Sequence, residues 1–257
     1  MIGAIAGDII GSVYEGHSIK TKTFPLFHPQ CRFTDDTVLT VAIADAIVNR
    51  RPYLEAVRAF GRRHPQAGYG GAFIRWLFSA EPTPYNSWGN GAAMRVSPVG
   101  FAFTSEEEVL EQARQTAVIS HNHPEGIKGA QAAALAVFLA RTGHEKEDIR
   151  SQITRRFGYG LNRGVDDIRP GYAFDVSCQG SVPEAVIAFL DSTSYEDAIR
   201  NALSLGGDSD TQACIAGGIA EAFYGGVPGE IRAAVGAHLT PDLREVVDAF
   251  YREYAIC

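Results

Sequence analysis

The sequence contains little cysteine and no long apolar run, and each absence excludes a class of protein. Its four cysteines form no Cys-x-x-Cys pair, which argues against a disulfide framework and a structural zinc site. Widely spaced cysteines favour buried thiols in a reducing cytoplasm. No stretch of about 18 consecutive apolar residues occurs, so no membrane-spanning helix is expected. The segment from Met1 to Asp8 lacks a basic region, so no signal peptide is predicted. The cysteines are Cys31, Cys178, Cys214 and Cys257.

An excess of positive charge is also missing. The formal net charge of −7 argues against nucleic-acid binding through a broad basic surface. A small anionic ligand can still bind at a helix N-terminus of an acidic protein. No linker rich in Ser, Pro or charge divides the chain, so residues 1–257 are expected to form a single domain. The sequence gives no direct signal for oligomeric state, and we expect a monomer.

Helical patterns dominate, and clear alternating strand patterns are absent. Ser105 and Glu108 form a predicted capping box, Ser194 is a predicted cap, and Pro124 and Pro241 mark further helix starts. A further run, 182–189, is interpreted as a helix rather than a strand. Glycines at positions 3, 7 and 11 predict a smooth helix face for close packing. We therefore predict an all-α fold, with residues 158–181 as an irregular active-site rim or surface loop. The main expected helices cover 38–49, 106–119, 126–141, 195–205 and 241–254.

Two similar acidic motifs each stand directly before a helical run. The first is Phe-Thr-Asp-Asp-Thr at 33–37, and the second is Gly-Gly-Asp-Ser-Asp-Thr at 206–211. Oxygen-only ligand sets favour Mg²⁺, Mn²⁺ or Ca²⁺, and bound cations would relieve the repulsion between clustered carboxylates. Asp208 and Asp210 can converge only if the chain bends, and the two preceding glycines allow that bend. Alternatively, these acids are only N-caps and first-turn acids, each stabilising its helix by about 0.5–2 kcal/mol.

These motifs, in this order, resemble the ADP-ribosylglycohydrolase family, which includes the enzyme that reactivates dinitrogenase reductase. The resemblance extends over residues 2–224. It implies a compact orthogonal helix bundle and two Mg²⁺ or Mn²⁺ ions held by the two acidic motifs. The metal ligands implied by the resemblance are Thr34, Asp35, Asp36, Asp208, Asp210 and Thr211.

Two glycine-rich loops, 68–71 and 87–95, provide candidate substrate contacts. Glycines at a helix start allow backbone N–H groups to approach a pyrophosphate. The second loop resembles the diphosphate-binding loop of the family, and Trp88 takes the place of an aromatic residue that would stack on adenine. The alternative for Trp88 is burial for packing. The candidate substrate-binding residues are Gly70, Ser87, Trp88, Gly89, Asn90, Gly91 and His121, the last matching a ligand-contacting histidine of the family.

The resemblance implies hydrolysis at C1″ of ADP-ribose, in ADP-ribosylated protein or a small molecule such as O-acyl-ADP-ribose. Asp35 or Asp36 is the candidate proton acceptor. Glu15 is a further candidate, since it resembles a glutamate that contacts one metal and gates the site in the branch acting on serine-linked ADP-ribose. The bond cleaved could involve arginine, serine, an acyl ester or a nucleobase, with a tilt towards an O-linked substrate. Two alternatives are a catalytically silent ADP-ribose-binding or structural protein and a metal-dependent phosphoesterase.

Overall fold

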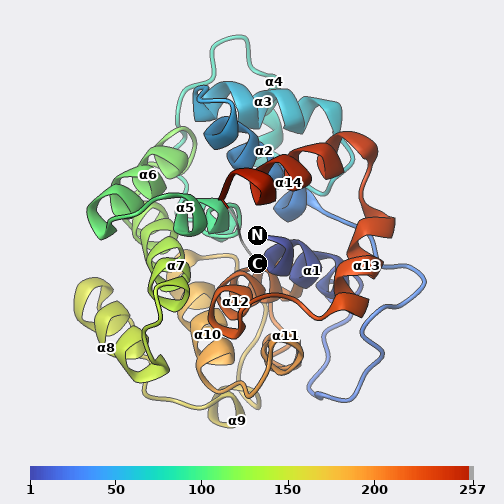
Figure 1. Cartoon of the computed structure of the whole chain (residues 1–257), viewed down its shortest axis with the longest axis vertical. Coiled ribbons are helices and arrows are strands. Elements are labelled where there is room, and N and C mark those ends of the chain that lie inside the picture. Colours follow the sequence, from blue (N-terminus) through green and yellow to red (C-terminus); the bar gives the residue numbers. More distant parts are fainter. Residues whose placement is uncertain (255–257) are drawn as a thin grey trace.

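The chain folds into α-helices in the computed structural model, which describes residues 1–254 (Figure 1). Within this range the β structure consists of one isolated antiparallel bridge, between Gly89 and Ser177. The predicted all-α fold is therefore confirmed. No helix among these residues is long and apolar enough to cross a membrane. The helices are α1 Ile2–Gly11, α2 Asp35–Val48, α3 Tyr53–Arg63, α4 Gly71–Phe78, η1 Asn90–Ala92, α5 Ser97–Ala102, α6 Glu106–Val118, α7 Pro124–Arg141, α8 Lys146–Phe157, α9 Val165–Ile168, α10 Cys178–Leu190, α11 Tyr195–Ser204, α12 Ser209–Tyr224, α13 Gly229–His238 and α14 Pro241–Tyr254.

Helices α1 and α12 lie together at the centre of the molecule, although they come from opposite ends of the sequence (Figure 1). All of α1 is buried, as expected for a helix that is apolar apart from Asp8. The two backbones touch, because a Cβ placed on Gly7 would lie only 2.0 Å from the Ala213 carbonyl oxygen. A Cβ on Gly11 would lie 2.6 Å from Asp210 Cα. The predicted smooth face is thus confirmed, and it brings the end of α1 against the first turn of α12.

The predicted helix starts are confirmed to within a few residues, because the capping side chains act as expected. Thr34 caps α2, which begins three residues before the predicted start. Ser105 accepts a hydrogen bond from Glu108 N at 3.2 Å, but Glu108 reaches back to Thr104 N instead of closing a box with Ser105. His123 caps α7 by accepting from the backbone N–H of Glu125 at 3.1 Å, so it is a helix-entry residue.

The stretch 158–181 is less irregular than predicted. It contains the short helix α9 and the first turn of α10, which starts at Cys178. Ser177 makes this early start possible by accepting a hydrogen bond from Gly180 N at 3.0 Å. The segment between α9 and α10 is the part that stays irregular, and Val176 in it lines the pocket described below.

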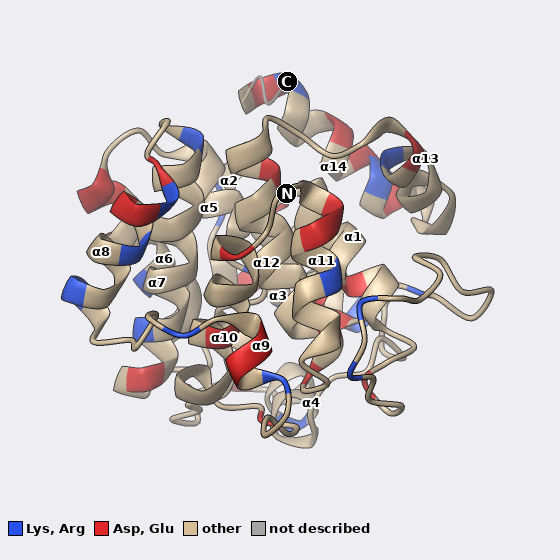
Figure 2. Cartoon of the chain, turned by 90° about the horizontal axis from the view of Figure 1, so that it is seen from below, with Lys and Arg blue, Asp and Glu red and all other residues tan. Residues whose placement is uncertain are grey.

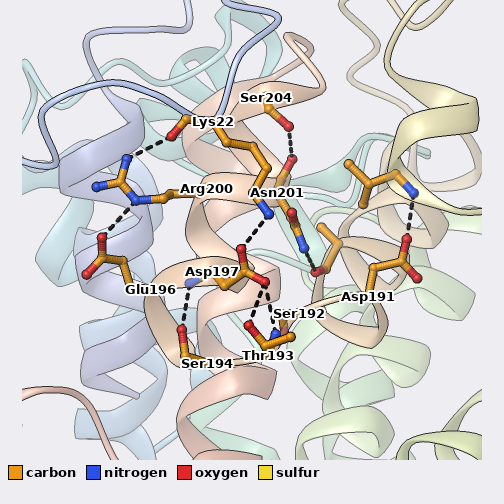
Figure 3. Close-up of polar contacts among 12 residues, drawn as sticks. Lys22, Asp191, Ser192, Thr193, Ser194, Glu196, Asp197, Arg200, Asn201 and Ser204 are labelled. Atoms are coloured by element: carbon orange, nitrogen blue, oxygen red, sulfur yellow. Dashed lines mark hydrogen bonds and ion pairs between the residues drawn. The ribbon is translucent and has the colours of Figure 1, made fainter.

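The loop between α1 and α2 is fixed onto α11 (Figure 3). Arg200 Nη1 donates to the carbonyl oxygens of Lys22 and Phe24, at 2.9 and 2.8 Å, and Lys22 forms an ion pair with Asp197. Ser18 Oγ donates to the carbonyl oxygen of Gly206 at 2.5 Å. These contacts tie the loop that carries Glu15 to the second acidic motif.

Surface charges of both signs are interspersed along the outer helices (Figure 2). Several form ion pairs within one helix, such as Arg150 with Glu147 in α8. Three cysteines are buried and free, as predicted, whereas Cys257 lies outside the described residues. The cytoplasmic location inferred from the cysteines stays a prediction, as does the monomeric state.

Candidate active site

One pocket of about 350 Å³ gathers most of the residues singled out from the sequence. It lies where the two acidic motifs meet the two glycine-rich loops. Among residues 1–254, Thr34 and Trp88 are the predicted site residues that do not line it. The predicted residues that do line the pocket are Glu15, Asp35, Asp36, Gly70, Ser87, Gly89, Asn90, Gly91, His121, Asp208, Asp210 and Thr211.

Carboxylates from three parts of the chain converge at one end of this pocket. Oxygens of Glu15, Asp208 and Asp210 all lie within 4.8 Å of one another. Oxygens of Asp8, Asp36 and Asp210 form a second such group, so Asp210 belongs to both. Asp35 lines the pocket but joins neither group. We call these two groups together the acidic cluster.

The chain bends before α12, as the glycine pair predicts. Gly206 has φ +68°, a backbone conformation that residues other than glycine rarely adopt. A Cβ on Gly207 would lie 2.3 Å from Tyr172 Cε1, so this position also requires glycine. The bend leaves Asp208 at the N-cap position of α12 and Asp210 in its first turn, with both carboxylates facing the cluster.

Burial of these like charges strongly favours their protonated forms. Burial, followed by the charge of Asp8, raises the pKa of Asp35 to about 8. The pKa of Asp36 is raised well above its ordinary value by burial, Asp8 and Asp35, and that of Asp210 by burial and Asp36. Burial and Asp208 also raise the pKa of Glu15. A cluster of this kind is stabilised either by protons or by cations.

Side-chain N-capping does not account for these acids, although Asp35, Asp36 and Asp210 lie in the first turns of their helices. Thr34, not an aspartate, caps α2, and Asp208 makes no side-chain capping bond although it occupies the N-cap position. Asp36 Oδ1 is buried without a hydrogen-bond partner among the described residues. A buried carboxylate oxygen normally has a partner. The orphaned oxygen and the oxygen-only donor set fit a hard divalent cation.

Asp8 is the site residue that the sequence reasoning missed. Its carboxylate accepts four hydrogen bonds, from the backbone N–H and the hydroxyl of both Thr34 and Thr37. The distances from Thr34 N, Thr34 Oγ1 and Thr37 N are 2.9, 2.6 and 3.1 Å. Asp8 therefore fixes the position of the first acidic motif through hydrogen bonds from Thr34 and Thr37. A lone acid inside an otherwise apolar helix was the available signal, because a buried acid needs partners.

The glycine-rich end of the pocket is linked directly to the acidic cluster. Asn90 Nδ2 donates to Asp208 Oδ2 at 2.7 Å and to Ser181 Oγ at 3.2 Å, so both amide protons are used within the protein. The loop continues as the 3₁₀ helix η1, and no α-helix starts there. His121 lines this end of the pocket, with its ring against Tyr85 at a centroid distance of 5.8 Å.

Trp88 lies beside the pocket with its side chain in solvent. It is 48% exposed, so burial for packing is excluded. Its carbonyl oxygen accepts from Cys178 N at 3.0 Å, which fixes the backbone of the loop against α10. The indole is therefore an exposed aromatic surface on a fixed backbone.

Comparison with known proteins identifies the family. The model of the family described as ADP-ribosylglycohydrolase matches residues 1–256. The chain belongs to the ADP-ribosylglycohydrolase family. The resemblance inferred from the motifs is confirmed, and the pocket is the candidate active site of this hydrolase.

Individual relatives within the family are distant in sequence. The ADP-ribosylhydrolase ARH3 of Homo sapiens is 26% identical, over 88% of this chain and 84% of that protein. The ADP-ribosylarginine hydrolase Tri1 of Pseudomonas putida (strain GB-1) is 26% identical, over 77% of this chain and 61% of that protein. A solved structure described as an ADP-ribosylglycohydrolase-related protein complex has a TM-score of 0.73 and 24% identity, covering 98% of this chain and 95% of that one. This likeness confirms the predicted fold type.

Proposed function

We propose that this chain is a divalent-metal-dependent hydrolase that cleaves the bond at C1″ of ADP-ribose and releases free ADP-ribose. The main support is a single pocket with two chemically different ends. One end is an oxygen-only acidic cluster with a shared carboxylate, Asp210. The other is a glycine-rich loop facing a buried histidine, His121. The first suits cations and sugar hydroxyls, and the second suits a pyrophosphate.

The carboxylates of the acidic cluster other than Asp8, with Asp35 and two neighbouring hydroxyls, provide oxygen ligands that fit two Mg²⁺ or Mn²⁺ ions. Asp210 would be shared between the ions, because it is common to both groups of carboxylates. When bound, the ions would neutralise the cluster, hold ribose hydroxyls and make a coordinated water more acidic. We assign Asp8 a supporting role, since it already accepts four hydrogen bonds from Thr34 and Thr37. The proposed ligands are Thr34, Asp35, Asp36, Asp208, Asp210 and Thr211, with Glu15 at the pocket mouth.

Asp35 is the residue proposed to move the proton. It lines the pocket yet lies outside both converging groups, so one of its carboxylate oxygens can face a water molecule while the other contacts an ion. In the proposed reaction the water oxygen bonds to C1″ as the bond from C1″ to the leaving atom breaks. A carboxylate oxygen of Asp35 accepts the water proton and then passes it to the leaving atom, which regenerates the carboxylate. Asp36 is an alternative acceptor, and Glu15 is the alternative for a serine-type reaction.

An O-linked substrate, serine-linked ADP-ribose or O-acyl-ADP-ribose, is the class we propose. The support is the position of Glu15, which is exposed at the pocket mouth while a carboxylate oxygen of it lies near Asp208 and Asp210. There it can contact both the ribose end of the ligand and the group attached to it. Arginine-linked ADP-ribose is the competing substrate, since one relative of similar identity carries that activity in its name.

The deciding experiment measures release of ADP-ribose by chromatography from arginine-linked, serine-linked and O-acetyl substrates. We expect release from an O-linked substrate in Mg²⁺ or Mn²⁺ and its loss in EDTA. Release from the arginine-linked substrate alone would replace the proposed substrate class. AMP and ribose phosphate as products would indicate a phosphoesterase, and tight ADP-ribose binding without any product would indicate a binding protein.

Replacement of Trp88 tests the proposed contact of its indole with adenine. Trp88→Ala is expected to raise KM about 5- to 30-fold with little change in kcat, since stacking on a base contributes about 1–2 kcal/mol. The melting temperature should stay the same, because the side chain is already 48% exposed. Phe78→Ala is the matched control, an aromatic residue that is 54% exposed and does not line the pocket. Equal kinetics of both variants would reject the stacking role.

A further inference from the structure

A buried arginine lies behind the glycine-rich end of the pocket without an acidic partner. Arg95 is fully buried, and Nη2 donates to the Thr116 carbonyl oxygen at 2.7 Å and to Ser120 Oγ at 3.0 Å. Its Nε and Nη1 have no hydrogen-bond partner among residues 1–254. Burial lowers the pKa of Arg95 to about 10, so the group stays charged at neutral pH. Arg95 forms no ion pair among the described residues, and a buried charge without an ion pair is costly, so packing alone does not explain it.

The hydrogen bond from Arg95 decides how the Ser120 hydroxyl is oriented. A guanidinium can only donate, so the hydroxyl oxygen accepts this bond and its own proton must point elsewhere. His121 Nδ1 lies 2.8 Å from Ser120 Oγ and is the acceptor within reach among the described residues. Donation from Ser120 to Nδ1 is the arrangement that gives this hydroxyl proton an acceptor. A neutral imidazole that accepts at Nδ1 carries its proton on Nε2.

Nε2 faces the loop that lines the pocket. A Cβ on Gly91 would lie 3.0 Å from His121 Nε2, and one on Gly89 would lie 3.8 Å from it. His121 is only 5% exposed, and its Nε2 has no hydrogen-bond partner in the described part of the chain. Burial, and secondarily the charge of Arg95, hold the pKa of His121 well below its ordinary value. The ring is thus a neutral donor with its N–H unused.

We propose that Arg95 and Ser120 are positioning residues that hold His121 in the Nε2–H form and direct this donor at an anionic group bound against Gly89 and Gly91. Under the proposed function, on which this inference rests, that group is a phosphoryl oxygen of the ADP-ribose pyrophosphate. Of the three residues Arg95, Ser120 and His121, the family resemblance assigns a ligand contact only to His121. The relay behind it explains why a buried cation stands next to a histidine that stays neutral.

The tautomer of His121 is measurable in the ligand-free protein. Long-range proton–nitrogen correlation spectra of nitrogen-15-labelled protein distinguish the two neutral forms and the imidazolium, and His121→Asn assigns the signal among seven histidines. We expect Nε2–H in the wild type. Ser120→Ala should mix the two neutral forms and weaken ADP-ribose binding about tenfold, the loss expected for one hydrogen bond to a charged acceptor. Ser97→Ala is the matched control, since Ser97 is buried and its hydroxyl has no partner among the described residues.

An Nδ1–H form or an imidazolium in the wild type would overturn the relay, and so would an unchanged tautomer in Ser120→Ala. Equal ADP-ribose affinity of the two serine variants would overturn the role of the donor in binding. Failure of the proposed function would give a different result. The wild type would then release no ADP-ribose from any substrate, although His121 carries its proton on Nε2.

Discussion

Asp36→Ala and Asp210→Ala are each expected to lower kcat at least about 10³-fold, since divalent ions contribute several kcal/mol to transition-state stabilisation. The helical circular dichroism should stay unchanged. Asp36 Oδ1 makes no hydrogen bond within residues 1–254, and Oδ2 accepts a long one from Thr34 Oγ1 at 3.4 Å, so the replacement breaks little structural contact there. Asp210 is common to both carboxylate groups, so its loss should disturb both proposed ions. Metal titration by calorimetry would show the loss of binding directly.

The same variants should be more stable than the wild type when metal is absent. In EDTA the raised pKa values mean that ionising these acids opposes folding. At low pH the buried acids are protonated and do not oppose folding. As the pH rises, the unfolded chain ionises first, so the folded state loses stability relative to it. For Asp35 the loss spans the range from its ordinary 3.8 to about 8. The melting temperature of Asp36→Ala minus that of the wild type should therefore increase from pH 5 to pH 8 in EDTA. Excess Mg²⁺ should reverse the order, because only the wild type gains stability from the ions.

Asp148→Ala is the control for these variants. Asp148 also lies in the first turn of a helix, α8, but it is exposed and belongs to neither carboxylate group. Its replacement should leave activity and the metal response unchanged. If Asp36→Ala and Asp210→Ala instead unfold the protein with or without metal, the acids act as helix-start residues and the metal site is wrong.

The sequence predicts best the features that depend on neighbouring residues. Ser105 and Ser194 mark true helix starts, because a cap and its partner lie within three residues of each other. The two acidic motifs were also visible, since each places hydroxyls and carboxylates side by side. Their meeting was inferred from a resemblance, and its physical basis is the contact of α1 with α12 through Gly7 and Gly11.

Contacts between distant residues were beyond the sequence reasoning. Arg95 and Ser120 are 25 positions apart, and each looks ordinary within its own segment. The irregular appearance of 158–181 hid the start of α10, because the cap at Ser177 follows a loop without helical periodicity. Asp8 was hidden in the same way, among apolar residues of a helix whose packing partners lie far along the chain.

Asp8→Ala is expected to destabilise the protein by about 3–5 kcal/mol, the usual cost of removing one partner from a buried charged network. Four donors from Thr34 and Thr37 would lose their acceptor inside the core. For a chain of this size the melting temperature should fall by about 10 °C. Metal affinity should fall as well, because Thr34 and Thr37 fix the start of α2, where Asp35 and Asp36 lie.

The sign of the stability change separates the two roles that geometry allows Asp8. Asp8 shares a carboxylate group with Asp36 and Asp210, so it could be a metal ligand. A ligand should behave like Asp36, whose replacement stabilises the metal-free protein. A support for the first acidic motif should destabilise the protein in EDTA and in Mg²⁺ alike. A double-mutant cycle with Thr37→Val adds a second measure, because the two replacements should cost less together than the sum of both alone. We expect the support role, since Thr34 and Thr37 donors already surround both oxygens of Asp8.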